Sequence, residues 1–98
     1  MCACVYILRC NDGGCYYGST NDLTERLEWH REGRVASTTW RRPLRLVYFE
    51  QHETLSQARQ RERSFKNGRT RRKTIENLIA RFPADRLSPF AWAACQGS

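Results

Sequence analysis

Five side chains of this 98-residue sequence stand out as candidates to exchange protons or bind ions. Two are phenols, one is a guanidinium, one an imidazole and one a carboxylate: Tyr6, Tyr16, Arg26, His30 and Glu62. Phenol and imidazole groups donate and accept protons, a guanidinium binds anions, and a carboxylate can hold a cation. Whether they work together depends on the elements that position them.

The first two elements form a β-hairpin. Residues 4–10 are rich in β-branched and aromatic side chains, residues 11–14 (Asn-Asp-Gly-Gly) are turn formers, and residues 15–20 resume as a strand. A two- or four-residue turn would put Tyr6 and Tyr16 on opposite faces of the sheet. A three-residue loop with a bulged glycine would put them on the same face, and the two adjacent glycines make this loop plausible.

A helix is expected over residues 22–31, with Asn21 or Asp22 as its cap and an end near Gly33. One helical face has the spacing i, i+3, i+4, i+7: Leu23, Arg26, Leu27 and His30. The arginine and the histidine therefore flank the stripe that faces the sheet.

A second helix is expected from Thr54, which caps it with Gln57 reaching back, to Lys66. Its inward stripe consists of Leu55, Ala58, Glu62 and Phe65. An acid on the apolar stripe of a basic helix needs a partner to offset its desolvation. That partner is either a protein cation such as Arg26 or a bound metal ion, and the sequence alone slightly favours the ion pair.

Two further elements complete the core. Residues 44–50 are expected to form a third strand, central in the sheet because its apolar run is nearly continuous. Thr70 is expected to cap a third helix that ends at Pro83, with an apolar face of Ile75, Leu78, Ile79 and Phe82. Its first turn, Arg71-Arg72-Lys73, is basic where the helix dipole disfavours cations, which suggests attraction to an external anion, although exposed charges cost little.

The remaining segments are less regular. Residues 34–43 form a flexible loop with three arginines and Trp40, which could contact phosphates and stack on an unpaired base. Equally, the loop could be solvated, with the tryptophan covering part of the core. We assign residues 1–83 to one domain and residues 84–98 to a C-terminal tail that either packs on the domain or stays mobile.

The composition narrows the class of protein. Seventeen Lys and Arg against ten Asp and Glu give a net charge of +7, which favours a polyanionic partner, nucleic acid first and a membrane surface second. No apolar stretch has the length of a membrane span and no signal peptide begins the sequence, so we expect a cytoplasmic protein. The odd number of cysteines and the lack of a Cys-x-x-Cys pair favour reduced thiols over disulfides or zinc: Cys2, Cys4, Cys10, Cys15 and Cys95.

The order of these elements resembles the GIY-YIG nuclease superfamily, most closely its small stand-alone bacterial members. The matching parts are Cys4-Val5-Tyr6, then Tyr16-Tyr17-Gly18, then Arg26 with His30, then Glu62, over roughly residues 3–80. The resemblance implies an α+β fold, a three-stranded antiparallel sheet flanked by helices. It also implies a metal-dependent endonuclease that cleaves DNA.

The resemblance implies a role for each matching residue. Tyr6 stands where the family has its general base, Tyr16 and Arg26 where the scissile phosphate is positioned, and Glu62 where Mg²⁺ or Mn²⁺ is held. His30 matches a histidine of part of the family. Arg9 or Arg26 could favour the phenolate of Tyr6. Contacts to nucleic acid are expected from Arg9, Arg34, Thr39, Trp40, Arg41, Arg42 and Lys66.

Some features depart from the family pattern. The first motif has Cys4 in place of its glycine, the second has Tyr17 in place of its isoleucine, and the asparagine that follows the glutamate in some members has no secure counterpart. Two other classes stay open: a non-catalytic nucleic-acid-binding module, and a small interaction protein that uses the hairpin cysteines. A minimal domain favours recognition of strandedness or branching over a long sequence.

Overall fold

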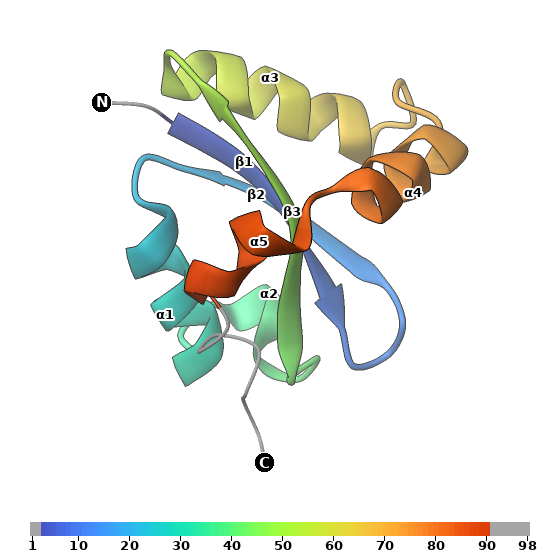
Figure 1. Cartoon of the computed structure of the whole chain (residues 1–98). Helices are drawn as coiled ribbons and strands as arrows, with labels where there is room; N and C mark the ends of the chain where they lie inside the picture. Colours follow the sequence, from blue (N-terminus) through green and yellow to red (C-terminus); the bar gives the residue numbers. More distant parts are fainter. Residues whose placement is uncertain (1–2, 91–98) are drawn as a thin grey trace.

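Three antiparallel strands form one sheet in the order β2-β1-β3 (Figure 1). The computed structural model describes residues 3–90. In chain order the elements are β1 (Ala3–Cys10), β2 (Cys15–Thr20), α1 (Leu23–Glu32), α2 (Ala36–Thr39), β3 (Leu44–His52), α3 (Leu55–Lys66), α4 (Arg72–Arg81), α5 (Ala84–Leu87) and a 3-10 turn at Ser88–Phe90. The predicted α+β class with a three-stranded antiparallel sheet is confirmed.

The β1–β2 hairpin closes with a three-residue loop. The amide of Cys10 donates to the carbonyl of Gly14 at 2.9 Å, and Gly13 adopts φ +86°, the left-handed conformation that glycine tolerates. The resulting register pairs Leu8 with Tyr16. Because directly paired residues share a face, Tyr6 and Tyr16 lie on the same face of the sheet. Of the two loop alternatives, the bulged three-residue loop is therefore the one that forms.

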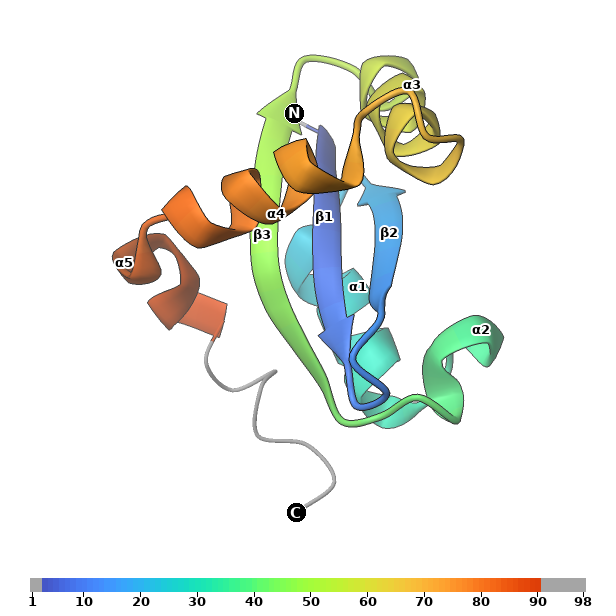
Figure 2. The same ribbon diagram turned by 90° about the vertical axis from the view of Figure 1, so that its right-hand side faces the viewer.

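The central strand is β1, so the expectation that residues 44–50 would be central is wrong (Figure 2). β3 is an edge strand that pairs only with β1 among the described strands. Its apolar run has another cause, because helices cover both of its faces. Leu46 and Phe49 enter one core, and Val47 and Tyr48 enter the other.

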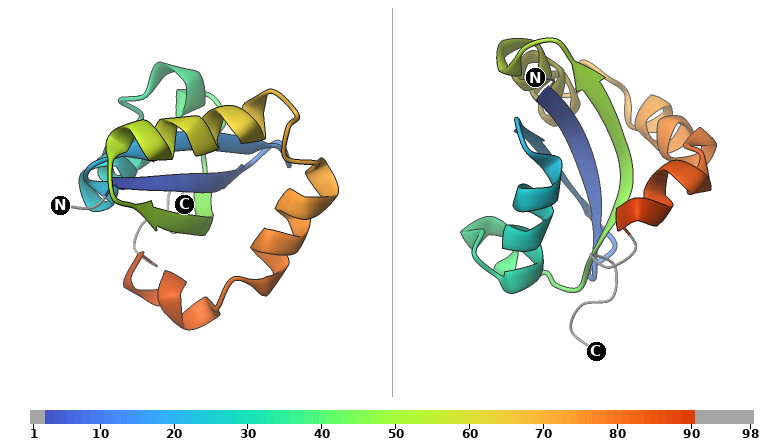
Figure 3. Two further views of the ribbon diagram at one scale, coloured as in Figure 1. Left: turned by 90° about the horizontal axis from the view of Figure 1, so that it is seen from above. Right: turned by 60° about the vertical axis from the view of Figure 1, so that its left-hand side comes forward.

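Helices cover both faces of the sheet (Figure 3). On one face, α1 packs Leu23 and Leu27 against alternate residues of β1, which include Tyr6 and Leu8. On the other face, α3 and α4 contribute apolar side chains to a second core: Phe65, Ile75, Leu78 and Ile79. The strands are thus held between two apolar layers, which is what positions the side chains of β1 and β2.

Capping confirms two of the three predicted helix starts. The carboxylate of Asp22 accepts from the amide of Glu25 at the start of α1, and Thr54 with Gln57 forms the predicted capping box of α3. The third predicted start, with Thr70 as the cap, is wrong. The N-cap of α4 is Arg71, with no side-chain cap, because the Thr70 hydroxyl is instead hydrogen-bonded at 2.7 Å to Ser64 of α3.

The irregular segments differ in part from expectation. The predicted loop 34–43 contains the short helix α2, and Trp40 is 74% exposed, so it does not cover the core. Residues 84–90 form α5 and the 3-10 turn, and Leu87 and Phe90 pack against the α1-side core. The rest of the predicted tail, 91–98 with Cys95, and also Cys2, lie outside the described residues.

Cys4 and Cys10 are buried among the apolar side chains of β1, as expected for thiols acting as strand residues. Within residues 3–90, no cluster of three or more His, Cys, Asp or Glu side chains could hold a metal ion. The same part of the chain has no helix long and apolar enough to cross a bilayer.

Candidate active site

A buried chain of hydrogen bonds joins β1 to α1 and α2. The Tyr6 hydroxyl lies 2.9 Å from Nε2 of His30, and Nδ1 of His30 lies 2.8 Å from the hydroxyl of Thr38. All three side chains are almost fully enclosed, with exposures of 1%, 1% and 0%. The sheet thus presents the tyrosine to a histidine whose other nitrogen is held by α2.

The Thr38 hydroxyl also lies 3.3 Å from the carbonyl of Val35, to which it can donate its single proton. In that arrangement the threonine oxygen accepts from Nδ1–H of His30, and Nε2 accepts from the phenol of Tyr6. This tautomer makes His30 a proton acceptor facing Tyr6.

Burial favours the neutral form of both partners. It lowers the pKa of His30 to about 4, with a smaller contribution from the positive charge of Arg26. Burial also raises the pKa of Tyr6, and the nearby Tyr16 and Glu62 add to that effect, while Arg26 opposes it. At neutral pH, Tyr6 is therefore a phenol hydrogen-bonded to an uncharged imidazole.

Tyr16 completes an aromatic group with these two residues. Its ring centroid lies 5.0 Å from that of His30 and 6.4 Å from that of Tyr6. The Tyr6 ring reaches this position by crossing Gly18, its cross-strand partner on β2. A Cβ atom at position 18 would lie 2.5 Å from Cζ of Tyr6, so only glycine leaves room for the phenol.

Arg26, one helical turn before His30, is the cation that acts on Tyr6. Its charge opposes the rise in the pKa of the phenol but does not reverse it, so the expectation that an arginine would favour the phenolate is not met. Arg9 lies on the opposite face of the sheet, where it contacts Cys15 Sγ at 3.2 Å and Glu76 at 3.4 Å. The guanidinium of Arg26 lies over the ring of Trp29, with its Cζ 5.1 Å from the ring centroid.

Glu62 reaches the edge strand β2 from α3. Its Oε1 accepts a hydrogen bond of 2.6 Å from the Ser19 hydroxyl, and its Oε2 lies 2.6 Å from Nζ of Lys66. The protein cation that offsets its desolvation is thus Lys66, and not Arg26 as suggested. The ion pair stays inside one helix, between residues four apart.

The oxygen donors at Glu62 suit a hard divalent cation. Mg²⁺ binds through one or two carboxylates and keeps several waters, so a single carboxylate beside the hydroxyl of Ser19 is a fitting donor set. The Glu62 side chain is 19% exposed, and that of Lys66 is 50% exposed and free to turn away. A metal ion would compete with this ammonium group for the same carboxylate.

The residues predicted to contact nucleic acid fall into two groups. Trp40, Lys66 and Arg34 are exposed, although Arg34 lies 3.7 Å from Glu32. The other four bond within the protein. Arg9 pairs with Glu76 at 3.4 Å and Arg41 with Asp12 at 2.9 Å. The last two donate to backbone carbonyls: Arg42 to residues 31 and 39, and Thr39 to residues 33 and 35.

Sequence reasoning missed two residues of the site, Thr38 and Ser19. Thr38, and not its neighbour Thr39, contacts His30. The sequence does not distinguish Thr38 from Thr39, because two adjacent threonines in a loop give no sign of which one is buried. Ser19 pairs with Glu62 across 43 positions of sequence, a contact that no local pattern reports.

The fold defines a small α+β domain in which Tyr6 and Tyr16 lie on the α1 face of the sheet with His30. Glu62 reaches Ser19 of the edge strand β2 from α3, on the opposite face. The chain belongs to the GIY-YIG family, a family of nucleases: residues 2–76 match the model described as the GIY-YIG catalytic domain. It is similar to proteins named UPF0213 from Staphylococcus aureus strains Mu3 and N315, at 43% identity over 78 residues, or 79% of this chain and 94% of each relative.

A solved structure agrees with this assignment. The solution NMR structure of a UPF0213 protein from Bacillus halodurans is similar, with a TM-score of 0.51 and 33% sequence identity. The match covers 82% of this chain and 84% of that one.

Proposed function

We propose that this protein is a divalent-metal-dependent endonuclease that hydrolyses DNA phosphodiester bonds. The observation that carries the proposal is the hydrogen bond of 2.9 Å between Tyr6 and a neutral His30, set beside Arg26. Hydrolysis needs a water to lose a proton and charge on the phosphoryl oxygens to be stabilised. These residues can supply both.

Proton transfer runs from water to Tyr6 and onward. A phenol with a raised pKa is a poor base on its own, so Tyr6 takes the proton of the attacking water as it passes its own proton to Nε2 of His30. The hydroxide forms the new bond to phosphorus as the bond between phosphorus and the leaving sugar oxygen breaks. The imidazole keeps the proton that the phenol passed on, and the leaving oxygen takes a proton from solvent. Thr38 keeps the accepting nitrogen pointed at the phenol.

Arg26 and Tyr16 hold the scissile phosphate. The guanidinium binds phosphoryl oxygens through charged hydrogen bonds, and the Tyr16 hydroxyl can donate a further one. A phosphate near Arg26 would also offset the positive charge that lowers the pKa of His30. Substrate binding would therefore make the histidine a better proton acceptor.

Glu62, with the hydroxyl of Ser19 beside it, would hold Mg²⁺ or Mn²⁺. Such an ion, when bound, stabilises negative charge on the leaving oxygen. Binding of the metal requires Lys66 to release the carboxylate, and the freed ammonium can then face the phosphate backbone.

The substrate is expected to be single-stranded or branched DNA, within the cytoplasm. The exposed Trp40 can stack on an unpaired base, while Arg34 and Lys66 can contact phosphates. Such contacts recognise strandedness and backbone more than sequence.

The experiment is a panel of labelled single-stranded, duplex, flap and junction DNAs and one RNA, incubated with Mg²⁺, Mn²⁺ or EDTA. We expect metal-dependent cleavage that is strongest on single-stranded or branched DNA. Tyr6→Phe serves as the matched control, because it removes only the hydroxyl. Cleavage in EDTA, or equal cleavage by the control, would contradict the proposal.

A non-catalytic nucleic-acid-binding module is the second candidate. It is favoured by the engagement of both Glu62 oxygens by groups of the protein itself. In that case the panel would give salt-sensitive binding to every substrate and cleavage of none.

A further inference from the structure

A hollow lies on the α3–α4 face of the sheet, opposite the face that carries Tyr6 and His30. It has a volume of about 280 Å³ and lies between the β1–β2 hairpin, the end of α3 and the start of α4. We name it the α3–α4 hollow. Its charged lining consists of Arg9, Lys66, Arg72 and Glu76, and Tyr17 adds an aromatic wall.

The hollow shares Lys66 with the active site. Nζ of Lys66 lies 2.6 Å from Glu62 and 6.0 Å from the ring centroid of Tyr16, while the same side chain lines the hollow. A strand whose phosphate is held at Tyr16 would therefore meet the hollow next, around the edge of β2. Lys66 thus lines the hollow and pairs with a residue of the proposed catalytic set.

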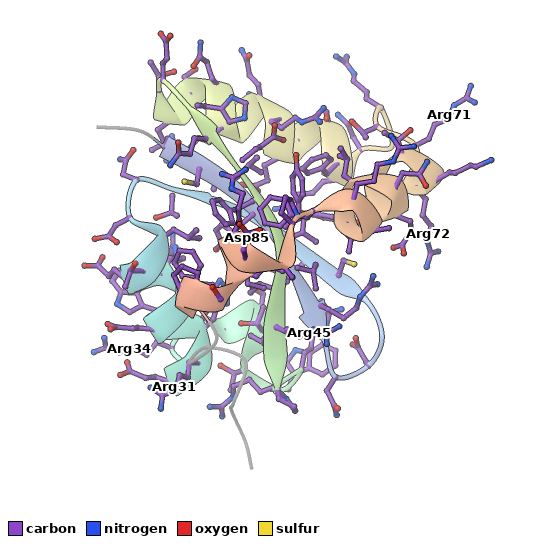
Figure 4. The ribbon with its side chains drawn as sticks, viewed as in Figure 1. Arg31, Arg34, Arg45, Arg71, Arg72 and Asp85 are labelled. Atoms are coloured by element: carbon purple, nitrogen blue, oxygen red, sulfur yellow. The ribbon has the colours of Figure 1, made fainter. Side chains whose placement is uncertain are left out.

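Acidic residues neutralise only part of the positive charge around the hollow, because Arg9 pairs with Glu76 and Lys66 with Glu62, whereas Arg72 has no ion pair within residues 3–90. Within residues 3–90, four cations of the α3–α4 connection and the first turn of α4 have no acidic partner: Arg69, Arg71, Arg72 and Lys73. Figure 4 shows Arg71 and Arg72 extending outward from the start of α4. In the loop of residues 34–43, by contrast, Arg41 and Arg42 are bonded within the protein.

These cations lie at positions where the local electrostatics of the helix disfavour positive charge. Positive charge in the first turn of a helix opposes the helix dipole, and neighbouring guanidinium groups repel one another. The segment buries little, since only Ile75 of α4 is fully buried, so packing does not require the arginines. An external polyanion would relieve the repulsion.

We propose that the α3–α4 hollow binds the sugar-phosphate backbone of the nucleic-acid strand next to the scissile phosphate. The inference rests on the proposed function for the position of that phosphate. Arg72 in the lining contacts a phosphate, and so does Arg69, which stands between the lining residues Gly68 and Thr70. Lys66 bridges the two sites, and Arg9, paired with Glu76, also lines the hollow. Contacts of this kind add affinity without reading sequence.

The test compares two double variants that each remove two positive charges. Arg69→Gln with Arg72→Gln removes one charge from the lining of the hollow and one from the segment that borders it, between Gly68 and Thr70. Arg45→Gln with Arg81→Gln is the matched control, because both of its residues are exposed and lie outside the hollow. Binding of a fluorescein-labelled 20-nucleotide single strand is measured by anisotropy at several salt concentrations, and cleavage of the same strand is measured with Mn²⁺.

For the hollow variant, we expect the slope of log affinity against log salt to fall by about 1.4, since each single-strand phosphate contact contributes about 0.7. KM should rise at least tenfold with little change in kcat, and the control should match the parent in both. Equal slopes in the two variants would overturn the proposal. If the parent binds but never cleaves, the nuclease function fails, and the slope still decides the role of the hollow.

Discussion

The ring of Tyr6 crosses Gly18 on the neighbouring strand, so the absence of a side chain at one position allows the phenol at another to reach His30. The pair lies directly across the β1–β2 ladder. Gly18, in the motif Tyr16-Tyr17-Gly18, is thus required for the packing of Tyr6, in the motif Cys4-Val5-Tyr6.

Gly18→Ala should therefore displace the phenol. The new methyl group would overlap the Tyr6 ring, which costs about 1 to 3 kcal/mol of stability as an overpacked core does. Urea unfolding measures this cost, and cleavage should fall together with it. Gly68→Ala tests the specificity of the effect, because a Cβ there meets no atom within 4 Å, although its φ of +81° adds backbone strain. A Gly18→Ala protein that cuts at the parental rate would contradict this account.

Tyr6→Phe and Glu62→Ala should each lower the cleavage rate by about 100- to 10,000-fold, the usual effect of losing a positioned acid–base group. The first removes the proton carrier, and the second removes the proposed metal ligand. Circular dichroism and DNA binding should stay close to those of the parent. Parental cleavage by both variants would eliminate the assigned roles.

Thr38→Val should impair catalysis through His30. Losing the acceptor for Nδ1–H frees the imidazole to change tautomer or rotate, and loss of such an orienting partner costs roughly 10- to 100-fold at metal-bound histidines. Thr39→Val is the matched control, because its hydroxyl bonds only to loop carbonyls. Nitrogen-15 NMR of the ring reports the tautomer directly. A ring still protonated at Nδ1 in Thr38→Val would show that Thr38 does not set it.

The pKa of His30 predicts a pH dependence of stability. The folded protein holds His30 with a pKa of about 4, and the unfolded chain has the ordinary value of 6.5, so the unfolded state binds more protons between these values. The free energy of unfolding should therefore fall as the pH drops from about 6.5 to about 4, by roughly 2 to 3 kcal/mol. Urea unfolding across this range measures it. In His30→Gln, the free energy of unfolding should fall less over this pH range. If it falls as much as in the parent, groups other than His30 cause the pH dependence.

The sequence by itself determined the local architecture. The hairpin, the caps at Asp22 and Thr54, and the spacing of Arg26 and His30 depend on neighbours within a few residues. Such signals are readable because turn and capping preferences are local. In α3, the helical spacing of Glu62 with Leu55, Ala58 and Phe65 likewise predicted that Glu62 points inward.

Tertiary structure decided which groups became partners. It made β1 the central strand, gave Glu62 to Lys66 and Ser19, and selected Thr38 over Thr39 for His30. It also engaged Arg41 and Arg42 within the protein and left the cations of α4 exposed. The reason is physical: a side chain's local sequence limits where it can point, whereas its partner depends on which distant elements pack beside it.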